Sequence, residues 1–362
     1  MDPATLESLI VKEIRKAKEI SRRDLAVNLS IAKSTAGRRI DSMIDRGMVR
    51  ESGIEDRKEV GRPRRFLELR GDYGAYAGFD FDARFLHAVL VDFNHGILER
   101  RKVRLSSEPT RDEVLGRIRE AIEGFRTHST RIFGIGIGVP GHIRREARQA
   151  IYYPFVEGWS NVDLPAELDL EPEMLHIENN TRAVALGEYW LGTHMGSDHL
   201  VCFAVRTGVA AAMVVNGALV VGRHELAGEI RAWPVGENTW LERVASVRSV
   251  TDGEMTGCDR WNEFVTACRD GHEESLELLS KTARHHGEAV SRMVQLLDPA
   301  VVFLSGSFAE LEDLYFDRVR KSVADSLEGH YFNPPPIRPT TFGEFAGAHG
   351  AAALAAAEAK LP

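Results

Sequence analysis

The sequence predicts an α/β fold in which a small helical domain with a β-hairpin precedes a larger α/β body. Within the first 70 residues, three short helical patterns are followed by two strand patterns. From residue 75 onward, strand patterns alternate with amphipathic helical ones. A chain of 362 residues is long enough for two or three domains that each bury a core.

The composition is that of an ordinary soluble protein, with 43% hydrophobic and 28% charged residues. No apolar run approaches the roughly 18 residues of a membrane span, and the N-terminus lacks the pattern of a signal peptide. We therefore expect a cytoplasmic protein with no membrane contact. Cys202, Cys258 and Cys268 have no close spacing, so neither a disulfide framework nor a thiolate zinc site is predicted.

Charge is distributed unevenly along the chain. Residues 1–70 hold 17 Lys and Arg against 12 Asp and Glu, which gives +5, whereas the remaining residues carry −13 of the total of −8. This distribution favours contact between the N-terminal part and an anionic polymer.

The three N-terminal helices have recognisable start and stop signals. Residues 6–17 carry apolar side chains at helical spacing. Ser21 and Asp24 have the spacing of a capping box and predict the start of a second helix. Ser30 is expected to cap a third helix, and Gly47 suits the left-handed position that ends it.

Residues 48–51 and 65–69 are predicted strands joined by a charged loop. Three helices and a hairpin form a winged helix-turn-helix, in which the third helix enters the major groove of DNA. Polar side chains off its apolar stripe can contact phosphates and base edges. The candidates are Lys33, Ser34, Thr35, Arg38 and Arg39. The alternative is a solvated polar face in a protein-binding winged helix.

Arg62 and Arg64 flank Pro63 after the predicted wing. Proline fixes an extended backbone, and the arginines on either side can enter a narrow minor groove. The alternative is a rigid interdomain linker, and both roles can hold together.

The body begins with strand patterns at residues 77–80, 86–92 and 97–98. A helix is predicted over 111–125, and residues 132–141 form a glycine-rich buried strand that runs into a turn. This order is typical of the ribonuclease-H-like lobe of the actin and sugar-kinase group.

Residues 177–188, Ile-Glu-Asn-Asn-Thr-Arg-Ala-Val-Ala-Leu-Gly-Glu, resemble the Glu-Asn-Asp-x-Asn-x-Ala-x-x-Gly-Glu signature of the ROK family of bacterial sugar kinases and related repressors. The segments 134–141 and 342–354 also resemble family motifs. The resemblance covers essentially the whole chain. It implies a winged helix-turn-helix at 1–72 and a two-lobed ROK domain. Lobe 1 spans 73–196, with a helix at 345–360 packing back on it, and lobe 2 spans 197–344 and carries ligand binding and dimerisation.

Several functional positions of the family are changed. Asn180 stands where the kinases have the catalytic Asp, and an amide cannot act as a general base near neutral pH. In the first phosphate loop, Asp82 and Ala83 replace two glycines, which should repel ATP. The second phosphate loop begins at Arg206 and is also altered. No catalytic residue and no cofactor are therefore expected.

The zinc site of many ROK proteins is predicted to be absent. Ala232 stands where the family has a zinc-binding His, and the cysteines of the motif are missing. His285 and His286 cannot replace it, because adjacent helical residues point about 100° apart.

The resemblance implies a partly retained sugar pocket. Asn179 and Glu229 match positions that hydrogen-bond sugar hydroxyls, whereas Phe155 replaces a sugar-binding Asn. With Asn180, these are the candidate ligand-binding residues. Phe155 and Trp159 could instead be core residues, and Glu229 a salt-bridge partner. An anionic ligand would be favoured if Arg145, Arg148, Arg206 and Arg223 face the cleft.

The resemblance implies a transcriptional regulator that acts as a repressor and binds double-stranded operator DNA as a homodimer or tetramer. Its catalytically inactive ROK domain would sense a sugar, a sugar phosphate or another sugar-derived ligand. Two alternatives remain. One is an active sugar kinase with a regulatory role, and the other is a dimeric DNA-binding protein that senses no ligand.

Overall fold

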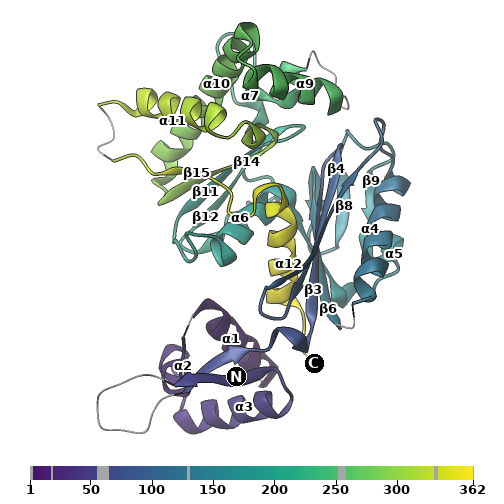
Figure 1. The fold of residues 1–362 in the computed structure, drawn as a ribbon, viewed down its shortest axis with the longest axis vertical. Helices are drawn as coiled ribbons and strands as arrows, with labels where there is room; N and C mark the ends of the chain where they lie inside the picture. The colour runs from purple at the N-terminus through teal and green to yellow at the C-terminus, as the bar shows by residue number, and fades with distance from the viewer. Residues whose placement is uncertain are drawn as a thin grey trace.

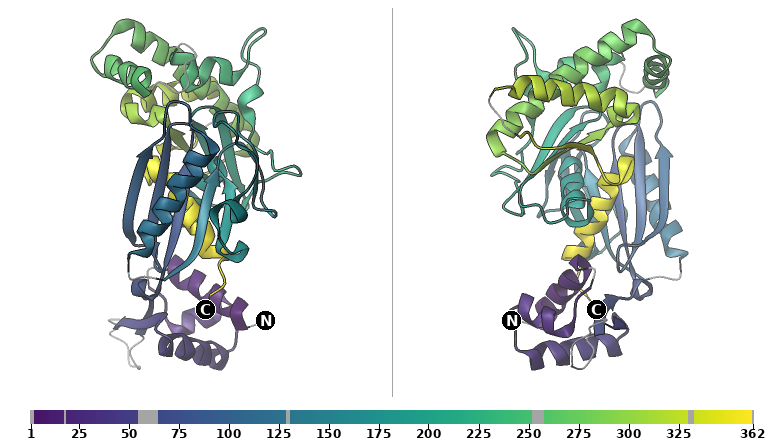
Figure 2. Two further views of the ribbon diagram at one scale, coloured as in Figure 1. Left: turned by 90° about the vertical axis from the view of Figure 1, so that its right-hand side faces the viewer. Right: turned by 60° about the vertical axis from the view of Figure 1, so that its left-hand side comes forward.

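The computed structural model describes residues 3–17, 19–54, 65–128, 131–251, 258–329 and 333–361. A small N-terminal head lies beneath a larger body that contains two five-stranded sheets (Figure 1). The two further views in Figure 2 keep the head at the same end of the body, with the C-terminus beside it.

The head contains three helices, α1 (Pro3–Lys16), α2 (Arg22–Asn28) and α3 (Lys33–Asp45), followed by the antiparallel strands β1 (Val49–Ile54) and β2 (Arg65–Leu69). This is the predicted order of elements. The capping box is present, because Ser21 accepts from the Asp24 amide and Asp24 accepts from the Ser21 amide. Gly47 follows α3 with a φ of 77°, as expected for its left-handed role.

The predicted cap of the third helix is wrong. Ser30 has a φ of 52° and lies in the left-handed region, two residues before the N-cap position. The N-cap residue is Ala32, which makes no side-chain capping hydrogen bond. The tight turn after α2 therefore uses Ser30 for its backbone conformation rather than for its hydroxyl.

The first sheet of the body has the strand order β10-β6-β3-β4-β5. Its strands are β3 (Ala75–Phe81), β4 (Phe85–Asp92), β5 (Ile97–Arg104), β6 (Ile132–Val139) and β10 (Leu175–Asn179). The meander β3-β4-β5 is antiparallel, and β6 and β10 add in parallel. Helix α4 (Arg111–Arg126) packs on the sheet, and its buried residues are the apolar ones of the predicted helical pattern.

The last long helix, α12 (Ala346–Glu358), packs against β3 and β6 of the first sheet. Glycine in these strands makes this approach possible. A Cβ at Gly78 would lie 2.0 Å from the Ala348 carbonyl oxygen, and one at Gly136 would lie 1.8 Å from that of Ala351. The glycine-rich strand and the alanine-rich helix are thus complementary surfaces, as the sequence indicated.

The second sheet has the order β13-β12-β11-β14-β15. Its strands are β11 (Leu200–Val205), β12 (Val209–Val215), β13 (Ala218–Leu219), β14 (Val301–Gly306) and β15 (Ile337–Pro339). The helices that accompany it are α7 (Leu241–Ala245), α8 (Val247–Val250), α9 (Cys258–Arg269), α10 (Glu273–Leu297) and α11 (Asp313–Leu327). In Figure 1 they lie at the end of the body opposite the head.

Helix α6 (Asn180–Leu191) contacts α12 as well as β11 and β12, so it joins the two sheets. A third, small sheet consists of β7 (His142–Arg144), β8 (Gln149–Tyr152) and β9 (Ser160–Asp163), followed by α5 (Leu164–Leu168). Short 3₁₀ helices η1 to η5 span Gly71–Tyr73, Pro172–Met174, Ile230–Ala232, Ser307–Leu311 and Gly343–Phe345. Among the described residues, no helix is long and apolar enough to cross a membrane.

The head is joined to the body by a shared apolar core. Buried residues of all three head helices form one cluster with residues of β3, β4 and α12, including Tyr76, Val91 and Ala355, and with Phe93, which follows β4. Arg15 of α1 also donates to the Phe93 carbonyl oxygen at 2.9 Å. The orientation of the head therefore depends on the position of the first sheet and α12.

Candidate functional site

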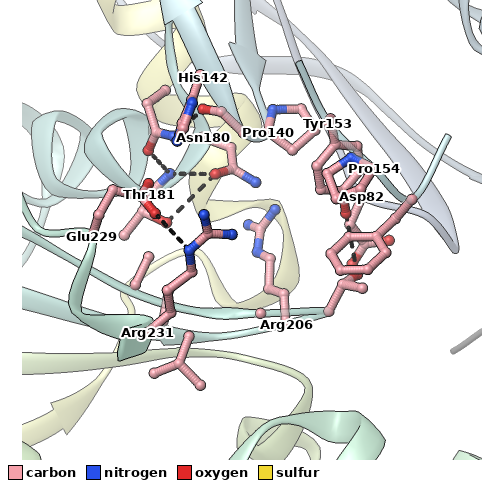
Figure 3. A pocket seen from close by; sticks show the side chains of 18 of the residues that line it. Asp82, Pro140, His142, Tyr153, Pro154, Asn180, Thr181, Arg206, Glu229 and Arg231 are labelled. Carbon is pink, nitrogen blue, oxygen red and sulfur yellow. Dashed lines mark hydrogen bonds and ion pairs between the residues drawn. The ribbon is translucent and has the colours of Figure 1, made fainter. Parts of the chain in front are cut away.

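A cavity of about 110 Å³ lies between the two sheets (Figure 3). It is lined by the N-terminus of α6, by the segment around β8, by the β11–β12 turn and by the η3 region. The lining residues include Pro140, Gly141, His142, Tyr152, Tyr153, Pro154, Phe155, Asn179, Asn180, Thr181, Arg206, Thr207, Gly208, Glu229, Arg231 and Glu242. All four predicted ligand residues, Phe155, Asn179, Asn180 and Glu229, are brought together here.

Asn179 has a structural role that sequence reasoning did not find. It is the N-cap of α6, and its Oδ1 accepts from the amides of Thr181 at 3.0 Å and Arg182 at 3.3 Å. Its Nδ2 donates to the Gly141 carbonyl oxygen at 3.1 Å. The hydrogen bonds of this side chain are therefore made largely to backbone groups.

Asn180 is the first residue of α6, and its side chain faces the cavity (Figure 3). Its Oδ1 accepts from the Thr181 amide at 2.8 Å. Its Nδ2 has no hydrogen-bond partner among the described residues, so this amide has two donors to offer a ligand.

Arg206 connects the two sheets. Its guanidinium donates to both carboxylate oxygens of Asp80, with Nη1–Oδ1 at 2.9 Å and Nη2–Oδ2 at 2.6 Å. Asp80 lies in β3 and is fully buried, and Arg206 follows β11. The bidentate pair therefore links the two sheets across the cleft.

Asp82 is a carboxylate that lines the same cavity as Asn180, yet it is poorly suited to replace a catalytic base. Burial raises its pKa, but the charges of Arg84 and Arg206 and the amides of Arg84 and Phe85 outweigh burial, so the pKa is lowered overall. A general base works best with a pKa near the operating pH. Asp82 instead remains an ionised acceptor bound to backbone.

Aromatic side chains form one wall of the cavity. Tyr153 donates its hydroxyl to Thr207 Oγ1 at 3.2 Å and packs edge-on against Phe155, with ring centroids 5.2 Å apart. Phe155 is half-buried and also packs on the first-sheet core. Trp159 is buried in that core against Phe81 and does not line the cavity. Trp159 is therefore a core residue, which was the alternative to a place in the ligand pocket.

Glu229 precedes η3, and its carboxylate lies 3.9 Å from the Arg231 guanidinium. Figure 3 shows Arg206 and Arg231 extending toward Asn180. Sequence reasoning missed Arg231, although its position two residues after Glu229 was a signal. Ala232 ends η3, and among the described residues no group of three or more His, Cys, Asp or Glu side chains could hold a metal ion.

Of the four arginines considered for an anionic ligand, only Arg206 lines this cavity. Arg145 pairs with Glu178, at 3.7 Å, and with Glu358. Arg148 donates to the Leu175 carbonyl oxygen at 2.7 Å, and Arg223 lies on the exposed surface.

The candidate DNA-binding residues of the head lie along α3. Lys33, Ser34 and Arg38 are exposed, whereas Thr35 and Arg39 are half-buried. Arg39 donates to Glu7 of α1 at 2.9 Å, so it also stabilises the packing of α1 against α3. Arg62 and Arg64 lie outside the described residues.

The sequence matches the model of the ROK family over residues 76–358. The putative xylose repressor of Caldicellulosiruptor sp. (strain Rt8B.4) is 25% identical over 345 residues, covering 87% of this chain and 86% of that protein. The xylose repressor of Bacillus subtilis (strain 168) is 23% identical and covers 96% and 94%. The glucokinase of Thermotoga maritima is 24% identical and covers 76% of this chain and 96% of the enzyme.

Solved structures show the same fold. A ROK family transcriptional regulator described as a homolog of the E. coli MLC protein superposes with a TM-score of 0.77 at 21% identity, covering 98% of this chain and 97% of that one. A ROK family glucokinase from Streptomyces griseus, in complex with glucose and AMPPNP, gives a TM-score of 0.67 at 24% identity, covering 78% and 99%.

Proposed function

Because the chain belongs to the ROK family, we propose that it is a DNA-binding transcriptional regulator, a repressor, whose ROK domain senses a small ligand without phosphorylating it. The observation that carries the proposal is the combination of a basic head with a kinase-like cleft in which Asn180 replaces the catalytic carboxylate. We place this regulator in the cytoplasm.

The head supports the DNA-binding part of the proposal. Its three helices and hairpin have the arrangement of a winged helix-turn-helix, and α3 presents Lys33, Ser34 and Arg38 to the exterior. The Bacillus subtilis repressor and the regulator structure match 96% and 98% of this chain, which leaves too few residues to omit the head, whereas the two glucokinases match 76% and 78%. We infer the domain division 1–72, 73–196 and 197–344, with 345–360 completing the first lobe.

A homodimer or tetramer would present two heads to the two half-sites of a palindromic operator. Fluorescence anisotropy with the DNA upstream of the protein's own gene, compared with random DNA, tests this. We expect a salt-sensitive preference for the upstream DNA. Arg38→Ala should weaken specific binding by about 1–3 kcal/mol if Arg38 contacts a base. The matched control Arg117→Ala, on the surface of α4, should bind as the wild type does.

The cavity supports the sensing part. It contains groups that bind polyhydroxy compounds: the free amide of Asn180, the carboxylate of Glu229 and the aromatic ring of Phe155. The cavity volume of about 110 Å³ is smaller than the roughly 300–1,000 Å³ of typical ligand pockets. A sugar or sugar phosphate would therefore enter a more open cleft and shift the arrangement of the two sheets.

Thermal denaturation against a panel of pentoses, hexoses and their phosphates tests ligand sensing, with xylose first because two of the relatives are named for it. A ligand that binds the folded protein raises the midpoint in a concentration-dependent way. Glu229→Gln should reduce that rise, whereas Glu277→Gln on the exposed face of α10 should not. No response across the panel would favour a ligand-independent dimeric DNA-binding protein.

The absence of phosphoryl transfer is tested separately. A coupled assay with ATP and the same sugars should show no turnover by the wild type, because Asn180 cannot act as a general base and neighbouring positive charges and backbone amides lower the pKa of Asp82. Turnover that is lost in Glu229→Gln would establish the alternative of an active kinase with a regulatory role.

A further inference from the structure

If the ROK domain controls the head, contacts must connect the ligand cavity to it. On the basis of the proposed function, we propose that Arg145 makes this connection by exchanging between two carboxylates. Glu178 precedes Asn179 in the wall of the cavity, and Glu358 ends α12. Arg145 does not line the cavity, so it is a positioning residue that acts on the head through α12.

Glu178 is the carboxylate on the cavity side. It is fully buried, and its Oε1 accepts from the Asn179 amide at 2.7 Å and from Arg182 Nε at 2.6 Å. Its Oε2 has no hydrogen-bond partner among the described residues, and Arg145 Nε lies 3.7 Å from it. This distance is too long for a hydrogen bond, so a buried acceptor is left open. A small displacement of Arg145 would fill it.

Glu358 is the carboxylate on the head side. Its Oε1 accepts from Arg145 Nη2, and its Oε2 lies 3.2 Å from His176 Nδ1. Ala355 and Ala359, on either side of Glu358 in the sequence, belong to the same apolar cluster as the three head helices. Both ribbon figures show the C-terminus next to the head (Figures 1 and 2). The Arg145–Glu358 pair therefore holds the part of α12 on which the head packs.

The segment between β13 and η3 connects Arg145 to the second sheet. The carboxylate of Glu225 accepts from the Arg145 amide at 3.2 and 3.3 Å, and the Glu225 carbonyl oxygen accepts from Arg182 Nη1 at 2.8 Å. Glu225 precedes the candidate ligand residue Glu229 in this segment. A ligand that moves the segment relative to the first sheet would therefore displace the backbone of Arg145. The two carboxylates give Arg145 two positions, which is the discrete element that such coupling requires.

Hydrogen exchange of the full-length protein, measured by mass spectrometry, tests this connection without a ligand. Glu225→Asn removes the carboxylate on the side of the second sheet, and asparagine suits the left-handed φ of 58° at this position. We expect the amides of α1 in the head to exchange about 2- to 30-fold faster, which is the range of coupling along such networks. Arg145→Met should give the same change. Glu358→Gln should also do so, because it leaves Glu178 as the only carboxylate that Arg145 can pair with.

Several comparisons separate coupling from a local loss of stability. In an Arg145→Met background, Glu225→Asn should cause no further change in α1, because the connection is already broken. Arg145→Lys keeps the charge and should restore most of the protection of α1. Exchange in α10, at the end of the body opposite the head in Figure 1, should be the same in every variant. The matched control Glu237→Asn, at an exposed position between η3 and α7, should behave as the wild type does.

Two results would overturn the role of Arg145. One is an α1 exchange rate that Glu225→Asn leaves unchanged, and the other is a full further increase when Glu225→Asn is added to Arg145→Met. Binding of the upstream DNA by the same proteins, measured by anisotropy, separates this failure from that of the proposed function. A wild type without preference for the upstream DNA contradicts the proposed function, whatever the exchange rates are. Specific DNA binding with unchanged α1 exchange contradicts the role of Arg145 alone.

Discussion

Replacing Arg206 by methionine tests whether the two sheets are held together by a buried ion pair. In the wild type, both oxygens of Asp80 accept from Arg206, at 2.9 and 2.6 Å, and Asp80 is completely buried. Arg206→Met keeps an apolar stem of similar length and removes only the charged group. Asp80 then has no ion-pair partner among the described residues.

The expected magnitude follows from the environment of Asp80. Breaking one side of a buried ion pair costs about 3–5 kcal/mol of the free energy of unfolding. A loss of about 3–5 kcal/mol is a large part of the stability of a typical domain.

The assay is urea unfolding at pH 7, followed by circular dichroism. The double variant Asp80→Asn with Arg206→Met removes both charges and should recover most of the loss, because no buried ion is left unpaired. Arg117→Met is the control, since Arg117 is an exposed residue paired with Glu120 and should change the stability by less than about 1 kcal/mol. A loss below about 1 kcal/mol in Arg206→Met, or a double variant no more stable than the single one, would refute the reasoning.

Other predictions address the core and the caps. Burial lowers the pKa of His286 to about 4, below that of an unfolded histidine. The free energy of unfolding should therefore fall as the pH drops from about 6.5 toward 4. In a His286→Gln variant, acid unfolding should lack this contribution to the pH dependence of stability. Asn179→Ala should lower the free energy of unfolding by about 1–2 kcal/mol through loss of the α6 cap, which urea titration measures. Gly136→Ala should prevent α12 from packing against β6, because the new Cβ would lie 1.8 Å from a backbone oxygen of α12. A thermal midpoint equal to that of the wild type would contradict this packing.

Much of the fold follows from local rules that the sequence displays. A few neighbouring residues determine each of three features: the capping box at Ser21, the left-handed conformation of Gly47 and the amphipathic pattern of α4. The family resemblance also brought the four candidate ligand residues to one place, and they line one cavity in the structure.

The remaining features depend on contacts between distant parts of the chain. The pair Arg206–Asp80 joins residues 126 positions apart, and Arg84 meets Ser307 across 223 positions. No local pattern indicates such partners. The side-chain amide of Asn179 was expected to bind a ligand. Asn179 also ends a strand and precedes a helix, and its side chain accepts hydrogen bonds from the free backbone amides of that helix. Ser30 was assigned a cap because serine is a common N-cap residue, yet the turn required a left-handed residue there.

The central claim, that a kinase-like cleft without a catalytic base controls a DNA-binding head, is tested most directly by one titration. The dissociation constant for the upstream DNA would be measured by fluorescence anisotropy at fixed salt, with increasing amounts of the compound that raises the thermal midpoint most. We predict that saturation changes the dissociation constant about 5- to 150-fold while ATP is not consumed. Equal affinity for upstream and random DNA, or an affinity that the compound leaves unchanged, would contradict the account.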